Sequence, residues 1–318
     1  MQDSKWPAIA VMGAGAVGCY FGGMLARAGA PVVLIGRPQH VEAMNRYGLL
    51  LESLHFREHI PVSASSDVAS ARNAAVVLLC VKTPDTEGAA RSLTPHLARG
   101  AILVSLQNGV DNVERIRSAA NIEAVPAVVY VAAEMTAPGC VKHTGRGDLI
   151  IGDLMGRSRD ESAHRLKLAD IATLFARAGV PCRISGNVEA DLWTKLIMNC
   201  AYNAISALTR VRYGYLVADA RTREVMRQVV EEVLAVARAA GVRMPNGDLV
   251  GAAWKLAETM PAAISSTAQD IAQGRRTEID SLNGYAARRG GELGIATPVN
   301  QTLHALVKLL EEGHCPPR

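Results

Sequence analysis

The sequence has few aromatic residues and only a small excess of positive over negative charge. Phe, Trp and Tyr make up 4% of its 318 residues, so the core must be built from aliphatic side chains. Lysine and arginine number 34 against 30 acids, which gives a formal net charge of +4. So small an excess speaks against a nucleic-acid or membrane-surface partner and is more compatible with a site for small anions.

Patterns of cysteine pairing and metal binding are absent as well. The six cysteines are scattered, several lie inside apolar runs, and none forms a CxxC pair. This distribution is typical of reduced, buried thiols and indicates a cytoplasmic protein. Because there is no HExxH motif and no Cys/His cluster with metal-ligand spacing, we expect no metal.

An uncharged run near the start, residues 8–26, is long enough to imitate a membrane span. It contains five glycines, at positions 13, 15, 18, 22 and 23, which argue against a simple span. We interpret the run as a short strand, a tight glycine turn and a helix, and we therefore expect no membrane partner.

Apolar strands alternate with helices through the first half of the chain. We predict strands at 8–12, 31–36, 74–81, 101–107 and 123–133, a hairpin or a pair of short strands within 49–62, two short antiparallel strands within 139–153 and a helix over 160–178. Continuous apolar strands separated by helices are typical of a parallel sheet that is covered on both faces.

Strand patterns stop at about residue 187. The remaining chain predicts helices over 189–208, 219–240, 248–257, 262–273, 277–293 and 298–312. Because 318 residues are many for a single core, we predict two domains. The first, 1–186, is an α/β domain with a Rossmann-type doubly wound sheet, and the second, 187–318, is all-helical.

A glycine motif lies between the first predicted strand and its helix. It consists of Gly13, Ala14, Gly15, Ala16, Val17 and Gly18. In this setting GxGxxG indicates a dinucleotide site, in which the first glycine permits a tight turn, the second lets the backbone approach a pyrophosphate, and the third packs the helix on the strand. A plain glycine-rich turn is the less favoured alternative.

The residue after the second strand selects the cofactor. NAD-binding proteins of this type carry an acid about twenty residues after the first glycine. Here Arg37 stands in that region and no acid occurs before Glu42. A guanidinium can hold a 2′-phosphate that a carboxylate would repel, so NADP(H) is the expected cofactor. The alternative is a solvated loop arginine.

Polar residues also follow two later strands. Lys82 ends one and Asn108 follows the other. Open α/β sheets bind ligands at the carboxyl ends of their strands, but Asn-Gly is also a common turn pair. Position alone leaves ligand contact and turn formation equally favoured.

The segment 191–210 carries Lys195, Asn199 and Asn203 at intervals of four within an apolar stretch. On a helix these residues share one stripe. A lysine there can give a proton to a carbonyl that receives hydride, and the amides can orient substrate oxygens. Spacing alone favours the plainer interpretation, an exposed lysine and two amides that satisfy helix ends.

A second polar cluster, within 265–280, holds Ser265, Ser266, Asp270 and Glu278. A carboxylate paired with a partly buried lysine would hold that lysine in place. A capped, solvated helix is the plain alternative, and spacing does not exclude it.

Taken together, the motifs resemble the ketopantoate reductase (2-dehydropantoate 2-reductase) family. They are GAGAVG, CVKT, QNGV, LWTKLIMNCAYNAISAL and SSTAQDIAQGRRTEID followed by LNG. The resemblance spans nearly the whole chain and keeps the order of the motifs. It implies an NADPH-dependent oxidoreductase that reduces 2-dehydropantoate to (R)-pantoate in pantothenate and coenzyme A biosynthesis.

The resemblance also implies roles for individual residues. Lys195 would be the general acid, and Glu278 would lie beside it and the substrate. Asn199 and Asn203 would bind substrate hydroxyl groups, and Ser266 the carboxylate. Lys82 and Asn108 would lie where the nicotinamide ribose and the substrate meet, and Arg37 would contact the 2′-phosphate.

Two positions depart from the family pattern. Ala263 stands where an asparagine helps to bind substrate, and Asp85 stands where glutamine is frequent. A reductase of a different 2-keto acid is therefore one alternative. A catalytically silent NADP-binding sensor is another, although such a protein would not need both Lys195 and Glu278. The apolar, alanine-rich helices leave a homodimer open.

Overall fold

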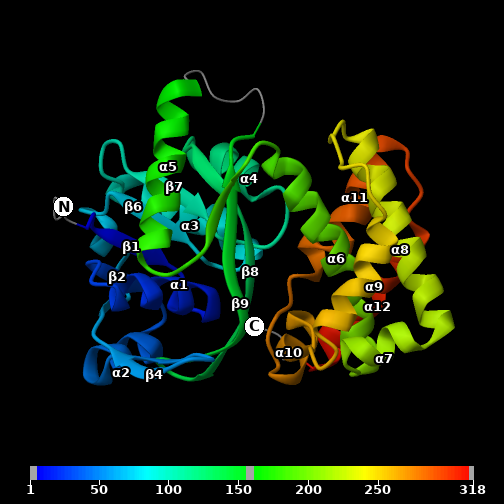
Figure 1. The fold of residues 1–318 in the computed structure, drawn as a ribbon, viewed down its shortest axis with the longest axis horizontal. Helices are drawn as coiled ribbons and strands as arrows, with labels where there is room; N and C mark the ends of the chain where they lie inside the picture. The colour runs from blue at the N-terminus through cyan, green and yellow to red at the C-terminus, as the bar shows by residue number, and fades with distance from the viewer. Residues whose placement is uncertain (1–5, 155–160, 315–318) are drawn as a thin grey trace. The chain divides into compact units, whose positions relative to one another are not determined.

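The computed structural model describes residues 6–154 and 161–314 (Figure 1). The chain divides into two compact units, Met1–Val188 and Glu189–Arg318. The first contains a mixed sheet flanked by helices, and the second is helical. The predicted fold class is confirmed.

The sheet of the first unit contains a run of six parallel strands. In spatial order these are β5 (Ser63–Ser65), β2 (Val32–Ile35), β1 (Ile9–Met12), β6 (Val76–Leu79), β7 (Ile102–Ser105) and β8 (Ala124–Ala137). The chain moves outward from β1 on one side and returns to build the other side from β6. The carboxyl ends of β1 and β6 therefore lie at the switch point of the sheet, where ligands of open α/β sheets bind.

Helices cover both faces of these strands. They are α1 (Ala16–Arg27), α2 (Pro38–Tyr47), α3 (Thr86–Leu93), α4 (Asn112–Ala120) and α5 (Glu161–Arg177). Alternate residues of β1 enter different cores: Ile9 and Val11 join the cluster with α1 and α5, whereas Ala10 joins the cluster with α3 and α4. This alternation explains why the strands are apolar throughout.

The region after β8 differs from the sequence prediction. Two short strands were expected within 139–153, but the structure has one long strand, β9 (Cys140–Gly152), antiparallel to β8. The glycines that suggest a break are absorbed by register shifts along the β8–β9 pair, and Gly147 (φ +133°) lies against the Tyr20 hydroxyl. Bulges of this kind let a strand continue past a glycine.

Three more strands complete the sheet. The predicted hairpin within 49–62 is confirmed as β3 (Leu49–Glu52) and β4 (Arg57–Ile60), and β3 pairs with β9. The sequence interpretation missed β10 (Cys182–Ser185), which pairs parallel with β9. This strand has only four residues, and its burial does not alternate cleanly.

The second unit begins within α6 (Val188–Thr209) and, over the described residues, continues with six shorter helices. These are α7 (Tyr213–Ala218), α8 (Ala220–Ala239), α9 (Leu249–Thr259), α10 (Ser266–Ala272), α11 (Asn283–Leu293) and α12 (Pro298–His314). The helix predicted over 277–293 is wrong in its first part, where a 3-10 turn at Ile279–Ser281 precedes α11. The short α7 was not predicted.

Buried amides join the helices of this unit. The Asn283 side chain donates to the Cys200 carbonyl oxygen in α6 at 3.2 Å and to Asn300 Oδ1 in α12 at 2.9 Å. Asn300 in turn donates to Glu232 Oε2 in α8 at 2.7 Å. Within the described ranges, no helix is both long and apolar enough to cross a membrane.

Candidate functional site

The glycine motif has the geometry of a phosphate-binding turn. Gly13 has φ +112°, and a Cβ there would lie 2.7 Å from the backbone of Cys80 and Val81. A Cβ on Gly18 would overlap the Gly13 carbonyl oxygen, so α1 packs tightly on β1. Gly15 has no atom within 4 Å of its Cβ position and faces open space. The first and third glycines are thus required by the protein, and the second leaves room for a ligand.

Backbone hydrogen bonds fix this turn. The amides of Gly13 and Ala14 both donate to the Ile35 carbonyl oxygen, at 2.9 and 3.0 Å. Ala16 and Val17 then form the first turn of α1, with Gly15 as the N-cap. Among the described residues, neither an acidic side chain nor a capping hydroxyl occupies that first turn. The positive end of the α1 dipole is therefore available to an anion.

Arg37 is an exposed residue at the N-cap of α2, directly after β2 and Gly36. Its Nη2 lies 3.3 Å from Nε2 of the buried His40. Burial, together with the charge of Arg37, lowers the pKa of His40. The ring therefore stays neutral near pH 7 and adds no positive charge that would repel the guanidinium, whose charge can be offered to a phosphate.

The loops after β6 and β7 are joined by a buried polar network. The Gln107 amide donates to the Val81 carbonyl oxygen at 3.0 Å and to Thr86 Oγ1 at 2.8 Å, and it accepts from Ser105 at 3.0 Å. Thr86 donates to Asn112 Oδ1 at 3.0 Å. The Gln107 side chain therefore ties the loop that contains Lys82 to the end of β7.

The same network holds the backbone of Asn108. Its carbonyl oxygen accepts from Thr83 Oγ1 at 2.8 Å and from Asn112 Nδ2 at 2.6 Å. Lys82 and Asn108 are both half-buried. The structure thus brings these two predicted residues onto adjoining loops. Of the residues that join them, the sequence interpretation had not singled out Thr83, Thr86 or Asn112.

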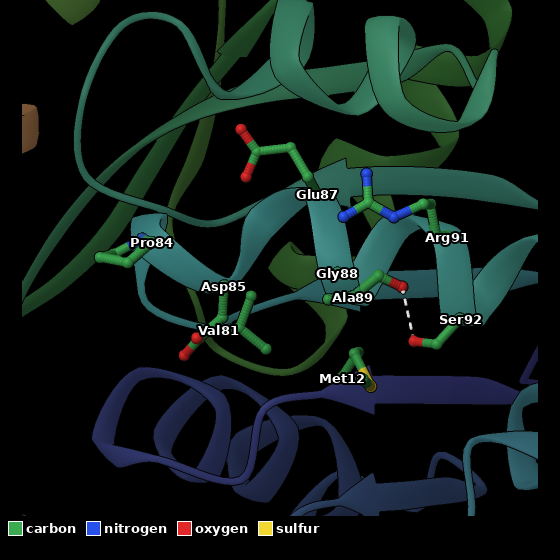
Figure 2. A pocket seen from close by; sticks show the side chains of 9 residues that line it. All are labelled: Met12, Val81, Pro84, Asp85, Glu87, Gly88, Ala89, Arg91 and Ser92. Atoms are coloured by element: carbon green, nitrogen blue, oxygen red, sulfur yellow. Dashed lines mark hydrogen bonds between the residues drawn. The ribbon is translucent and has the colours of Figure 1, made fainter. Parts of the chain in front are cut away.

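An open pocket of about 620 Å³ lies beside the carboxyl ends of β1 and β6 (Figure 2). Met12 and Val81 come from the two strand ends, and Pro84, Asp85 and residues of α3 form the rest of the lining. Met12 directly precedes the glycine motif, so the pocket adjoins the glycine turn. Its size is in the range of sites for small ligands.

The predicted polar stripe lies on α6. Lys195 and Asn199 are half-buried, and Asn203 is 4% exposed. Glu189 and Asp191 lie in the first turn, where acids stabilise a helix, and the flanking Trp193, Leu196 and Ile197 are buried in the core. The stripe is therefore not a solvated surface, in contrast to the interpretation that spacing alone favoured.

The start of α10 is attached to the end of this stripe. Ser265, the N-cap of α10, donates from Oγ to the Asn203 carbonyl oxygen at 3.2 Å and accepts from Ala268 N at 3.1 Å. Ser266, one residue later, is exposed. Ser265 thus has a structural role, and it places Ser266 close to Asn203.

Ala263 lies in the segment just before α10. Its carbonyl oxygen accepts from Tyr213 N at 3.0 Å, and the Tyr213 ring lies 4.2 Å from that of Tyr202 between centroids. The backbone of Ala263 is therefore fixed by the segment that contains Tyr213.

Glu278 is half-buried between two fully buried residues, Thr277 and Ile279. Its carbonyl oxygen accepts from Ser281 N at 2.9 Å, which closes the 3-10 turn. Asn283, just after that turn, bonds to Cys200 next to Asn199. The hydrogen bonds of Ser265 and Asn283 thus connect both halves of the predicted polar cluster to α6. Over the described part of the chain, no three His, Cys, Asp or Glu side chains gather as metal ligands would.

Comparison with known proteins identifies the family. The family described as "Ketopantoate reductase PanE/ApbA" matches residues 9–156, and "Ketopantoate reductase PanE/ApbA C terminal" matches residues 187–311. The chain belongs to the ketopantoate reductase family. It is therefore an oxidoreductase, and membership supports the use of a nicotinamide cofactor.

Individual relatives match over almost their full length. A 2-dehydropantoate 2-reductase from Pyrococcus horikoshii is 32% identical over 95% of this chain and 97% of its own, and one from Vibrio cholerae is 32% identical over 96% and 98%. The crystal structure of a PanE/ApbA family ketopantoate reductase from Ralstonia eutropha is 52% identical. It has a TM-score of 0.89 over 96% of this chain and 99% of its own.

Proposed function

We propose that this ketopantoate reductase family member reduces 2-dehydropantoate to (R)-pantoate with NADPH, as a cytoplasmic enzyme of pantothenate and coenzyme A biosynthesis. The observation that carries the proposal is the arrangement of the second unit. A half-buried lysine and two amides share one face of α6, and Ser265 attaches the start of α10 to that face. This arrangement occurs in a chain that matches named 2-dehydropantoate 2-reductases over 95% of its length.

The cofactor would be held by the first unit. The amides at the start of α1 and the space beside Gly15 suit the pyrophosphate, and the pocket next to Met12 and Val81 suits the adenosine end. The exposed Arg37 would bind the 2′-phosphate through charge-assisted hydrogen bonds. Lys82 and Asn108, held by the Gln107 network, would contact the nicotinamide ribose and the substrate.

The chemistry consists of one hydride transfer and one proton transfer. The nicotinamide of NADPH gives a hydride to C2 of the 2-keto acid, and the Lys195 ammonium gives a proton to the carbonyl oxygen, so that a 2-hydroxy acid and NADP⁺ form. Glu278 would hold the lysine and the substrate in place. Asn199 and Asn203 would bind the substrate hydroxyl groups, and Ser266 its carboxylate.

A second candidate substrate class follows from Ala263. An alanine cannot make the hydrogen bonds of the asparagine that the family pattern has here. This difference favours a 2-keto acid with fewer hydroxyl groups. The fold also occurs in a D-mandelate dehydrogenase solved with NADH and anilino(oxo)acetate, with a TM-score of 0.88 at 24% identity.

The test is NADPH oxidation with 2-dehydropantoate and with a panel of branched and aromatic 2-keto acids. We expect the highest kcat/KM with 2-dehydropantoate. If only another 2-keto acid is turned over, the proposed substrate is wrong and the proposed type of reaction stands. Tight NADPH binding without turnover of any acid would contradict the enzyme proposal and favour an NADP-binding sensor.

A further inference from the structure

One face of α12 carries three charged or titratable residues that the proposed reaction does not use. His304, Lys308 and Glu311 are spaced by four and three residues and therefore share one side of the helix. Glu311 is only 6% exposed, which is unusual for a carboxylate unless it is paired. Each of the three contacts the short segment 277–280, which contains Glu278.

The contact on the N-terminal side of Glu278 is made by Glu311. Its Oε1 accepts from the backbone amide of the buried Thr277. Its Oε2 accepts from Lys308 Nζ at 2.8 Å, so both carboxylate oxygens are engaged. Thr277 Oγ1 accepts in turn from Ile279 N at 3.3 Å. The amides of Thr277 and Ile279, one residue before and one after Glu278, are thereby linked through Thr277 to one buried carboxylate.

The contact on the C-terminal side is made through Asp280. Its Oδ1 lies 2.7 Å from His304 Nε2, and its Oδ2 accepts from Lys308 Nζ at 3.0 Å. Arg276 also faces this carboxylate, at 3.9 Å. Lys308 thus bridges Glu311 and Asp280, and the segment is held at residues one before and two after Glu278.

The packing of His304 requires a glycine. A Cβ on the buried Gly284 would lie 2.8 Å from two ring atoms of His304 and 3.1 Å from the Ile279 carbonyl oxygen. The backbone at the start of α11 can therefore approach the imidazole closely, and this packing holds the ring against Asp280.

The ionisation of the cluster agrees with its geometry. Burial by itself would raise the pKa of Asp280, but hydrogen bonds from His304 and Lys308 bring it below the usual value. For Lys308, burial acts to lower the pKa, and the bonds to Glu311 and Asp280 raise it. At neutral pH the lysine and the aspartate are therefore both charged.

From these contacts we propose that the face of α12 formed by His304, Lys308 and Glu311 positions Glu278 for catalysis. The three residues act through the backbone of 277–280 and touch neither substrate nor cofactor in this assignment. The inference rests on the proposed role of Glu278. Because the backbone beside Glu278 is fixed, the Glu278 side chain keeps its place. This matters for the rate, since a misplacement of about 1 Å in a catalytic group can cost about a hundredfold.

The test compares Glu311→Ala, Glu311→Gln and Glu312→Ala. The alanine removes the acceptor for Thr277 and the partner of Lys308, whereas glutamine keeps an acceptor oxygen. Glu312 is the matched control, because it is an exposed neighbour on the same helix. We expect Glu311→Ala to lower kcat by about tenfold to a hundredfold with unchanged NADPH affinity. Glu311→Gln should recover much of the loss, and Glu312→Ala should behave as wild type.

A double-mutant cycle with Glu278→Gln separates positioning from a general loss of structure. If α12 acts through Glu278, Glu311→Ala causes no further loss of kcat in the Glu278→Gln background. Full additivity, or unchanged kcat in a folded Glu311→Ala enzyme, overturns the proposal. If that variant does not fold, Lys308→Ala, which removes the bridge between Asp280 and Glu311, takes its place in the cycle.

Amide hydrogen exchange over 277–281 provides a measurement that does not depend on turnover. We expect faster exchange in Glu311→Ala than in wild type and Glu312→Ala, and unchanged exchange in that case would overturn the positioning proposal. If wild type reduces no 2-keto acid, or if Glu278→Gln is fully active, the proposed function fails. The exchange result then still decides whether α12 holds the segment.

Discussion

The glycine motif and the Glu278 segment are both short polar stretches, but they are held in different ways. The motif obtains its form from backbone geometry, since Gly13 has a positive φ and the amides of Gly13 and Ala14 both donate hydrogen bonds to the Ile35 carbonyl oxygen. The Glu278 segment is held by side chains of α12, roughly thirty residues later in the chain. The turn at the glycine motif is thus held by backbone contacts, to residues as far along the chain as Cys80, whereas the proposed catalytic carboxylate is placed by side chains of another helix.

The largest effect is expected from Lys195→Ala. This change removes the proposed proton donor from α6, the helix to which the Glu278 region is attached. General acid catalysis contributes about a hundredfold to ten-thousandfold, so kcat should fall by at least about a hundredfold. NADPH affinity, measured by titration, should not change. Lys255→Ala, at an exposed lysine of α9, is the control. A Lys195→Ala enzyme with full kcat would show that the α6 stripe does not supply the proton.

Two glycine variants test whether the backbone of the glycine motif serves the fold or the cofactor. Gly13→Ala introduces a Cβ 2.7 Å from the backbone of Cys80 and Val81 at φ +112°, and it should lower the free energy of unfolding by roughly 1–3 kcal/mol. Gly15→Ala meets no atom within 4 Å, so stability should stay within about 0.5 kcal/mol while NADPH affinity falls.

Thermal or denaturant unfolding and NADPH titration measure the two effects of these glycine variants. Equal destabilisation by both would mean that Gly15 has a structural role as well. Unchanged NADPH affinity in Gly15→Ala would mean that the open space beside it does not receive the pyrophosphate.

Arg37→Ala should change cofactor preference more than activity. A hydrogen bond to a charged group is worth about 1.5–3 kcal/mol, so the ratio of kcat/KM for NADPH over NADH should fall by about tenfold or more. Arg46→Ala, at the opposite end of α2, should leave the ratio unchanged. An unaltered preference in Arg37→Ala would place recognition of the 2′-phosphate elsewhere.

The smallest effect is expected from Asp280→Asn. The pKa of Asp280 is depressed in the folded protein, so its ionised form stabilises the fold above the unfolded pKa of about 4, and this contribution is lost as the pH falls through the folded pKa. Because Asp280 is 37% exposed, we expect about 1 kcal/mol or less at neutral pH. The free energy of unfolding of both proteins, measured from neutral pH into increasingly acidic buffer, should show the difference shrinking as the pH falls through the folded pKa of Asp280. A constant difference would contradict this account.

The features predictable from sequence were those with a local cause. The alternation of strands and helices and the GxGxxG turn follow from short-range patterns, and the fold class was confirmed. The prediction of two short strands in place of β9 was wrong. Gly145 and Gly147 suggest a break, whereas a bulged pairing with β8 absorbs them. β10 and α7 were missed because four to six residues carry too little periodicity.

For the candidate site, the sequence indicated the candidate residues but not the hydrogen-bond partners that hold them in place. Gln107 was visible as part of QNG, yet its bonds to Val81 and Thr86 depend on the pairing of β6 with β7. The spacing of His304, Lys308 and Glu311 was also visible. A charged stripe on a terminal helix usually faces solvent, and only the packing of α12 on residues 277–284 shows that this one does not.

The position of α12 in the chain has a consequence for biosynthesis. Asn300 in this helix bonds to Asn283, to Glu232 and to the Val229 carbonyl oxygen, which belong to segments translated earlier. Those helices leave the ribosome before the residue that joins them, whereas the partners of the glycine motif, Ile35 and Cys80, belong to the first unit, which is translated before the second. During synthesis the nucleotide-type turn can form early, and the helical unit waits for its last helix.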